Sequence, residues 1–174
     1  MRMFLDVFSG CSIASDAFPH EICYDGAAIK FEAKFITKTE DLGGLPSGEG
    51  DDEGPPAEGE TVIDLVDAYT LHPVPDLTSA EWMAIVKGIM KKVMGIVKEK
   101  EDMDEDKLKA YKKGCVSFVN FIKSNFKDIQ LYQGDIGEYE GEEQSYGYAL
   151  NENQDDPLSL SFYFFKDALN DVKY

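Results

Sequence analysis

This 174-residue sequence contains few histidines and no closely spaced pair of cysteines, and both shortages limit the catalytic and metal-binding sites that it could form. The two histidines, His20 and His72, each stand next to a proline in a stretch that predicts a loop, so we expect surface side chains rather than a general base. The three cysteines, Cys11, Cys23 and Cys115, are widely spaced and include no Cys-x-x-Cys pair. That spacing argues against a disulfide framework or a zinc site, and we expect buried or half-buried thiols in a reducing compartment.

Catalytic and targeting motifs are also missing. The sequence contains no Gly-x-Ser-x-Gly elbow, Walker loop, His-Glu-x-x-His pair or dinucleotide fingerprint, so we expect a protein that is not an enzyme and has no obligatory cofactor. The glycine-rich stretch 42–49 lacks a lysine and is followed by three acids at 51–53, which would repel a phosphate. No apolar run is long enough for a signal peptide or a membrane span, and we expect a cytoplasmic protein.

Basic residues are half as numerous as acidic ones. Seventeen lysines and arginines stand against 34 aspartates and glutamates, which gives a formal charge of −17 and a pI near 4.4. Binding to a nucleic-acid backbone needs clustered basic residues with little opposing charge, so this balance argues against a nucleic-acid partner. It suits basic, metal-ion or protein partners instead. The length predicts a single domain over 1–174, large enough to bury a core without disulfides or a metal.

The strongest pattern in the chain lies in residues 78–127, where two amphipathic helices are predicted over 78–100 and 104–126. Thr78 and Glu81 form a capping box for the first helix, and Asp104 is an acidic N-cap for the second. The short acidic connection makes the two helices antiparallel neighbours, which we call the helical hairpin. The predicted apolar stripes are Trp82, Ile85, Val86, Ile89, Val93, Ile96 and Val97 on the first helix and Leu108, Tyr111, Cys115, Phe118, Val119, Ile122 and Phe126 on the second.

The helical hairpin also carries most of the positive charge. Between Lys87 and Lys127 lie 11 of the 17 basic residues against six acids, so this segment has a net charge of +5 and the rest of the chain −22. The lysines opposite the apolar stripes have two interpretations, a solvated face or a surface that orients on an acidic partner. The candidate partner-binding lysines are Lys87, Lys91, Lys92, Lys98, Lys109, Lys112 and Lys113.

Strand signals lie on both sides of the helical hairpin. Alternating apolar residues over 29–35 are the clearest, and Asp25-Gly26 before them predicts a tight turn between two strands. Residues 12–21 predict a loop, and the prolines at 73 and 75 should end the preceding strand. Further strands are predicted over 1–8, 62–71, 129–133, 144–150 and 158–165. Because no βαβ rhythm is present, the pattern predicts an α+β fold with a mainly antiparallel sheet.

Acidic residues gather in two segments. Residues 40–60 contain six glycines, three prolines and eight acids but no basic residue, which predicts a disordered acidic loop. Residues 128–165 contain nine acids and no basic residue, so one end of the sheet should be negative. The acids at 102, 104 and 106 lack the glycine and bidentate glutamate of a calcium-binding helix–loop–helix, and we expect helix-capping residues there. The candidates for weak calcium binding are Asp135, Glu138, Glu140, Glu142 and Glu143.

Three stretches give the sequence a resemblance to a known family. Residues 42–50 (LGGLPSGEG) are similar to a first signature, with Leu45 in place of the usual Asn. Residues 125–135 (NFKDIQLYQGD) are similar to a second, with Asp135 where Glu is usual. The stretch 164–169 (FFKDAL) resembles a C-terminal strand, although the chain ends in Tyr rather than Cys. In this order around a basic helical hairpin, they resemble the translationally controlled tumour protein family over almost the full length of the chain.

The resemblance implies a tent-like arrangement of small sheets with a projecting helical hairpin and a long mobile loop, a fold similar to that of a Rab-binding guanine-nucleotide-release chaperone. It also implies binding of calcium, of tubulin through the helical hairpin, and of translation elongation factor one-alpha and its exchange factor. Growth and survival signalling through a Ras-like GTPase is implied as well. By family match, the GTPase contacts fall at Ser12 and at Gly134 and Asp135. Asp135 keeps the negative charge on a shorter side chain, whereas Ser12 cannot form an ion pair.

Two hypotheses of function follow. The first is a non-catalytic cytoplasmic adaptor that binds tubulin and translation-factor or small GTPases through the helical hairpin and one sheet face, with weak calcium binding as a modifier. The second is a modulator of nucleotide exchange on a small GTPase, an exchange or dissociation-inhibiting factor whose Asp135 region opposes the phosphate or magnesium site. A calcium buffer is a third interpretation, which the missing helix–loop–helix ligands disfavour.

Overall fold

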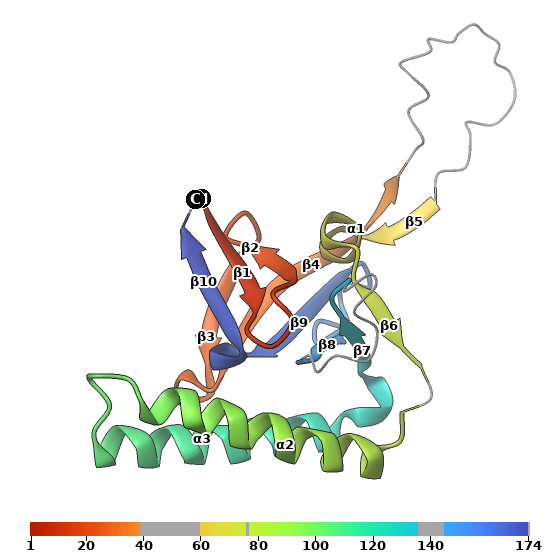
Figure 1. Ribbon diagram of the computed structural model, residues 1–174. Coiled ribbons are helices and arrows are strands. Elements are labelled where there is room, and N and C mark those ends of the chain that lie inside the picture. The colour runs from red at the N-terminus through yellow and green to blue at the C-terminus, as the bar shows by residue number, and fades with distance from the viewer. Residues whose placement is uncertain (39–59, 76, 136–144, 174) are drawn as a thin grey trace, which may run out of the picture.

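The computed structural model describes residues 1–38, 60–75, 77–135 and 145–173, and its strands form two antiparallel sheets (Figure 1). The strands are β1 (Arg2–Asp6), β2 (Ser12–Ser15), β3 (His20–Cys23), β4 (Ala28–Lys38), β5 (Glu60–Ile63), β6 (His72–Val74), β7 (Gln130–Gln133), β8 (Gly147–Leu150), β9 (Ser159–Phe165) and β10 (Leu169–Lys173). The helices are α1 (Asp64–Tyr69), α2 (Ser79–Lys98) and α3 (Glu105–Ser124), and short 3₁₀ turns occupy Tyr24–Gly26, Phe126–Asp128 and Lys166–Ala168. The predicted acidic loop over 40–60 lies outside the described residues except for its last residue.

The order of the strands confirms the predicted α+β class with antiparallel sheets. One sheet has the order β10-β1-β2, and the other has the order β3-β4-β9-β8-β7-β6 with β5 paired to β4. Strand β4 makes the most strand pairings in the larger sheet, because it pairs with β3, β5 and β9. Its alternation holds as predicted: Phe31 and Ala33 are buried and Glu32 is exposed. Pairing of Arg2 with Lys173 brings the two ends of the chain together.

The core divides into two clusters on opposite faces of the larger sheet. Because side chains alternate along a strand, Phe165 of β9 joins the cluster beneath the helical hairpin while Phe164 joins the cluster beneath the smaller sheet and α1. At the centre of the first cluster, Trp82 is fully buried and its indole Nε1 donates a hydrogen bond to the hydroxyl of Tyr148 at 3.0 Å. Burial of each such aromatic side chain contributes about 2–3 kcal/mol.

Helices α2 and α3 lie along the larger sheet, and their connection extends past it (Figure 1). Both predicted N-caps are confirmed: Thr78 Oγ1 accepts from the Glu81 backbone at 3.1 Å, the Glu81 carboxylate accepts in return, and Asp104 accepts from Lys107. The predicted stripe on α2 was too wide, since Ile85 and Ile96 are 38% and 37% exposed. Both lie at the edge of the buried stripe formed by Trp82, Val86, Ile89, Val93 and Val97.

Three predictions of secondary structure were wrong, and one strand was missed. Residues 12–21, predicted as a loop, contain β2 and β3, which depend on pairing with β1 and β4 for their backbone hydrogen bonds. Residues 62–71, predicted as one strand, end β5 at Ile63 and then form α1, with the carboxylates of Asp64 and Asp67 in its first turn. Strand β10 was not predicted, because its polar sequence LNDVK shows no apolar alternation. The prolines at 73 and 75 were predicted to end the strand over 62–71, but Pro73 lies within a separate strand, β6, which an edge strand permits.

The predicted turn at Asp25-Gly26 joins β3 to β4, and it lies against α3. Tyr24, Asp25 and Gly26 all have positive φ angles, of 54°, 55° and 90°. A Cβ on Gly114 of α3 would lie 2.0 Å from the backbone oxygen of Tyr24, so only glycine allows this close approach.

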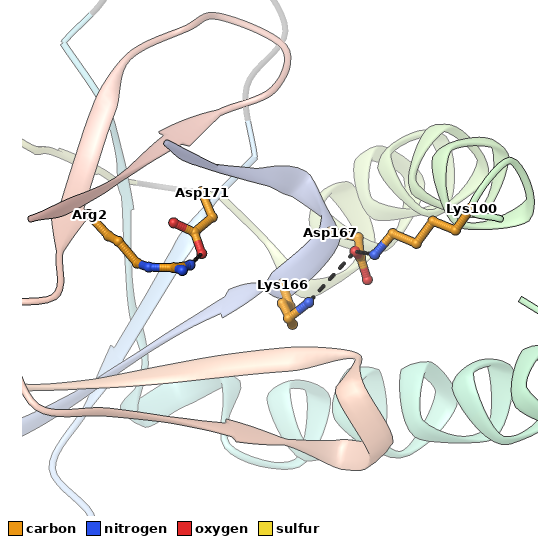
Figure 2. A network of polar contacts seen from close by, with 5 residues as sticks. All are labelled: Arg2, Lys100, Lys166, Asp167 and Asp171. Carbon is orange, nitrogen blue, oxygen red and sulfur yellow. Dashed lines mark hydrogen bonds and ion pairs between the residues drawn. The ribbon is translucent and has the colours of Figure 1, made fainter. Parts of the chain in front are cut away.

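Two ion pairs join segments that are far apart in the sequence (Figure 2). Lys100, just after α2, contacts the carboxylate of Asp167 at 2.5 Å, and Lys166 lies 4.0 Å from the same oxygen. The Asp167 side chain is only 8% exposed, so this pair fastens the end of the helical hairpin to the turn between β9 and β10. The second pair joins Arg2 and Asp171 across β1 and β10, where both side chains are exposed.

Candidate partner-binding surfaces

The first candidate surface is formed by seven of the exposed lysines on the two long helices, which we call the outer lysines. They point away from the core because the apolar stripes occupy the opposite sides of both helices. The outer lysines are Lys87, Lys91 and Lys98 on α2 and Lys109, Lys112, Lys113 and Lys123 on α3. Six of them belong to the predicted set, and Lys123 joins them at the end of α3.

The outer lysines have no carboxylate partners within the described part of the chain, where every ion pair within 4.0 Å involves other residues. The acids of the helical hairpin explain this, since they gather at its connection over 99–106 rather than between the lysines. An unpaired, exposed ammonium group is fully available to an acidic partner, and its field is weakened by salt.

Lys92, the seventh lysine of the predicted set, is placed differently. Its Nζ lies 5.5 Å from the centre of the Phe8 ring, in the segment after β1, which is a cation–π contact. Lys92 therefore links α2 to the segment after β1, and it is exposed like the other lysines of the predicted set. The 3.6-residue period places it near the side of α2 that borders this segment.

The second candidate surface lies where β2 begins and β7 ends, and we call it the Asp135 junction. The thiol of Cys11, the residue before Ser12, lies 3.2 Å from the backbone oxygen of Asp135 and donates to it. The imidazole Nε2 of His72, at the start of β6, lies 3.3 Å from the Asp135 carboxylate. The structure therefore brings the family-matched positions Ser12, Gly134 and Asp135 into one region, although Ser12 is 122 residues or more from the other two.

His72 is the residue of this junction that sequence reasoning missed. It was predicted to be an isolated surface side chain in a loop, but it lies in β6, which pairs with β7 and so places His72 opposite Gln133. Both His72 and Asp135 are about half exposed, so a docked partner can reach them. Only the strand pairing could have revealed the contact.

A buried carboxylate, that of Asp6, lies close to the Asp135 junction in the chain and holds the segments next to it by hydrogen bonds. Asp6 is 1% exposed, and its two oxygens accept hydrogen bonds from Ser9 and Ser145, each through a backbone amide and a hydroxyl, at 2.6–3.2 Å. A buried carboxylate needs such donors to offset its lost hydration. Cys11 contacts Asp135, and Asp6 contacts Ser145. The end of β1 and the segment that follows it therefore hold both described ends that flank residues 136–144.

The calcium candidates are only partly placed. Glu138, Glu140, Glu142 and Glu143 lie outside the described residues, and the carboxylate of Asp135 faces His72. In the part of the chain that the structure describes, no group of three or more His, Cys, Asp or Glu side chains is arranged to hold a metal ion. The described residues alone therefore do not fit a calcium site, and Asp104 caps α3 as predicted.

A groove of about 640 Å³ lies across β4 and β9 and is also lined by Phe18, Asp64 and Glu152. At its edge, Lys30 is shared by Glu152 at 3.4 Å and Glu21 at 3.7 Å, and the Tyr163 hydroxyl donates to Glu152 at 2.6 Å. Burial disfavours the ionised form of Glu152, but the hydrogen bonds from Tyr163 and Ser161 and the charge of Lys30 outweigh it, so the pKa of Glu152 is lowered. The predicted negative end of the sheet is thus partly neutralised here.

The thiols occupy the environments expected from their spacing. Cys115 is buried, and Cys11 and Cys23 are partly exposed. Burial raises the pKa of Cys115 to about 11, although the nearby Tyr111 hydroxyl lowers it. The reactive thiolate is therefore rare at Cys115 near neutral pH. No helix in the described residues is both long enough and apolar enough to cross a membrane.

Comparison with known proteins gives consistent matches over most or all of the chain. A family model described as translationally controlled tumour protein matches residues 1–170. A protein named "Translationally-controlled tumor protein homolog" from Theileria annulata is 27% identical over 184 residues and covers all of both chains. The protein of the same name from Candida albicans is 30% identical over 138 residues, which cover 78% of this chain and 80% of that one.

Two solved structures are similar in fold. The translationally controlled tumor-associated protein p23fyp of Schizosaccharomyces pombe aligns over all of both chains with a TM-score of 0.74 and 27% identity. The translationally-controlled tumor protein of Caenorhabditis elegans, at 23% identity, aligns over all of this chain and 99% of its own with a TM-score of 0.72. The second likeness shows the arrangement of helices and strands alone.

Proposed function

The chain belongs to the translationally controlled tumour protein family, and from that premise we propose that it is a non-catalytic cytoplasmic adaptor that binds acidic protein surfaces through the outer lysines. The partners that the family implies are tubulin, translation elongation factor one-alpha with its exchange factor, and small GTPases, in the regulation of growth and survival. The observation that carries the proposal is the separation of charge: a helical hairpin with unpaired lysines on a molecule of net charge −17. Such a dipolar molecule turns its basic side toward an acidic partner before contact.

The test compares two double variants that change the net charge equally. Reversing Lys112 and Lys113 to glutamate should weaken the capture of tubulin about tenfold at low salt, while reversing Lys34 and Lys173, which are exposed outside the helical hairpin, should leave it unchanged. Binding is measured by co-sedimentation with microtubules at several salt concentrations. Equal losses in both variants would mean that net charge alone governs binding, and salt-independent binding would contradict the electrostatic proposal.

A second candidate function is modulation of nucleotide exchange on a small GTPase by the Asp135 junction. What supports it is the contact of both Cys11 and His72 with Asp135, a position that matches one of the family's GTPase contacts. Ser12, which matches another, directly follows Cys11. Ser12 contributes a neutral hydroxyl there, and His72 adds positive charge next to Asp135 when protonated. The surface is therefore less negative than a pair of carboxylates would be, and we expect a weaker effect on a GTPase.

Release of a fluorescent nucleotide from the GTPase decides this candidate. The protein should change the release rate, and Asp135→Ala should remove the change while Asp128→Ala, an exposed acid before β7, should keep it. If adding the protein leaves the release rate unchanged, only the adaptor function stands.

Weak calcium binding is a proposal that rests on the acidic sequence over 135–143 and on the family. Isothermal titration calorimetry should give heat only at millimolar calcium, since an isolated cluster of carboxylates without built geometry binds loosely. Saturation at micromolar calcium would contradict this and favour a calcium buffer.

A further inference from the structure

Val116 of α3 is the most exposed large apolar side chain on the two long helices. It is 59% exposed, compared with 38% for Ile85 and 37% for Ile96 on α2. It lies in the middle of a 20-residue helix, opposite the buried stripe that includes Cys115 and Phe118. Its exposure is therefore not a consequence of a frayed helix end.

Lysines surround Val116 on the same side of α3. Lys112 and Lys113 precede it by four and three residues, and Lys109 and Lys123 lie seven residues to either side. Residues at these spacings share one face of an α-helix, and a stretch of 15 residues is about 21 Å long. None of the four lysines has an ion-pair partner among the described residues. We call this surface, formed by Val116 and the four lysines, the Val116 face.

The Val116 face is unfavourable in the free protein in two ways. Four like charges on one side of a helix repel each other, and a β-branched side chain in a helix has restricted rotamers without the compensation of burial. Both costs are relieved by a partner that supplies carboxylates around an apolar side chain. A chain with a net charge of −17 is in contrast repelled by long polyanions and by strongly anionic membranes.

We propose that the Val116 face binds an acidic peptide segment in which one apolar side chain is flanked on both sides by aspartate or glutamate. The apolar side chain packs on Val116, and the flanking carboxylates pair with the lysines on either side of it. This inference rests on the proposed adaptor function and deepens it, because it assigns the binding to α3 and adds an apolar anchor to the electrostatic attraction. Charge brings the segment to the helix, and the anchor selects among acidic segments.

Fluorescence polarisation with two labelled peptides tests the anchor. Both peptides carry the same glutamates, and the central residue is leucine in one and serine in the other. The protein should bind the leucine peptide about fivefold more tightly, the effect of removing the exposed three-fifths of a valine side chain from water. Val116→Ser should abolish this preference and leave binding of the serine peptide unchanged. Ile96→Ser on α2 is the matched control and should retain the preference.

Each other outcome overturns a defined part of the inference. If both peptides bind the unchanged protein equally well and Lys112→Glu with Lys113→Glu weakens both, the anchor is wrong and the electrostatic adaptor stands. If neither peptide binds at low salt, both the anchor and the adaptor are wrong. If Ile96→Ser removes the preference and Val116→Ser does not, the assignment to α3 is wrong. Tighter binding to phosphatidylserine vesicles than to the leucine peptide would reassign the face to a membrane surface. Val116→Ala is a second variant that removes most of the apolar side chain but keeps a high helix propensity, so a lost preference for the leucine peptide in this variant is not caused by loss of folding.

Discussion

Replacing Lys100 with alanine should destabilise the protein more than replacing its partner Asp167 with asparagine, although both changes remove the same ion pair. The reason is the difference in burial, because the Asp167 side chain is 8% exposed and that of Lys100 is 38% exposed. Without Lys100, the buried carboxylate keeps the more distant Lys166, at 4.0 Å, as an ion-pair partner. Without the charge of Asp167, Lys100 turns to water at little cost.

The magnitudes follow from these environments. Loss of one partner from a buried ion pair costs about 3–5 kcal/mol, and we expect the lower end, about 3 kcal/mol, for Lys100→Ala because Lys166 remains. Asp167→Asn should cost about 1 kcal/mol, the net contribution of a partly exposed charged hydrogen bond. The double variant should cost about as much as Asp167→Asn plus the lost packing of the lysine stem, so the two effects are not additive and differ from their sum by about 2 kcal/mol.

Urea unfolding measures all three variants. The chain has one tryptophan, Trp82, which is fully buried against the sheet and reports the release of the helical hairpin through its fluorescence. The exposed pair of Arg2 and Asp171 is the control, and Arg2→Ala should cost less than about 1 kcal/mol. The reasoning is refuted if Lys100→Ala costs no more than Arg2→Ala, or if Asp167→Asn is the more damaging change.

Three further predictions concern stability and reactivity. Gly114→Ala should lower the free energy of unfolding in urea by about 3 kcal/mol or more, because its Cβ would lie 2.0 Å from the backbone oxygen of Tyr24. Gly95→Ala, with nothing within 4 Å, should instead raise the free energy of unfolding by about 0.5–1 kcal/mol. Similar values for the two would contradict the close approach. In the native protein at pH 8, Cys115 should resist a thiol reagent until the protein unfolds, since its pKa is about 11, and rapid modification of all three cysteines would refute this. Because the pKa of Glu152 is lowered in the folded protein, its carboxylate stabilises the fold at pH values above its ordinary pKa of 4.5, and this contribution is lost as the pH falls through the pKa of the folded state. Glu152→Gln should therefore reduce the loss of stability below about pH 4.5. An unchanged dependence of stability on pH would argue against this reasoning.

Local signals predicted the helical hairpin accurately because its determinants are close together in the sequence. Thr78 and Glu81 are three residues apart, Asp104 directly precedes its helix, and the apolar stripes repeat within each helix. The alternating strand β4 was predicted for the same reason. The short segments β2, α1 and β10 were not, because four to six residues carry too little periodicity and obtain their hydrogen bonds or their packing from distant partners.

The candidate surfaces divide in the same way. The exposure of Lys112 or Lys113 follows from the apolar stripe on the opposite side of the helix, so composition and period suffice to predict it. The period gives the direction of a buried stripe but not its width, which is why Ile85 and Ile96 were predicted to be buried. The width depends on how far the sheet extends beneath the helix.

The sequence by itself determined the class of fold, the two long helices, the basic character of the helical hairpin and the family. These properties depend on local patterns and on composition, so they can be predicted without knowing which residues are neighbours in space. Only the tertiary structure decided that His72 and Cys11 meet Asp135, that Lys100 pairs with Asp167, and that Lys92 lies over Phe8. Each of those contacts joins residues 63 to 124 positions apart along the chain. Residues so far apart in the sequence meet only because strands pair and helices pack on a sheet.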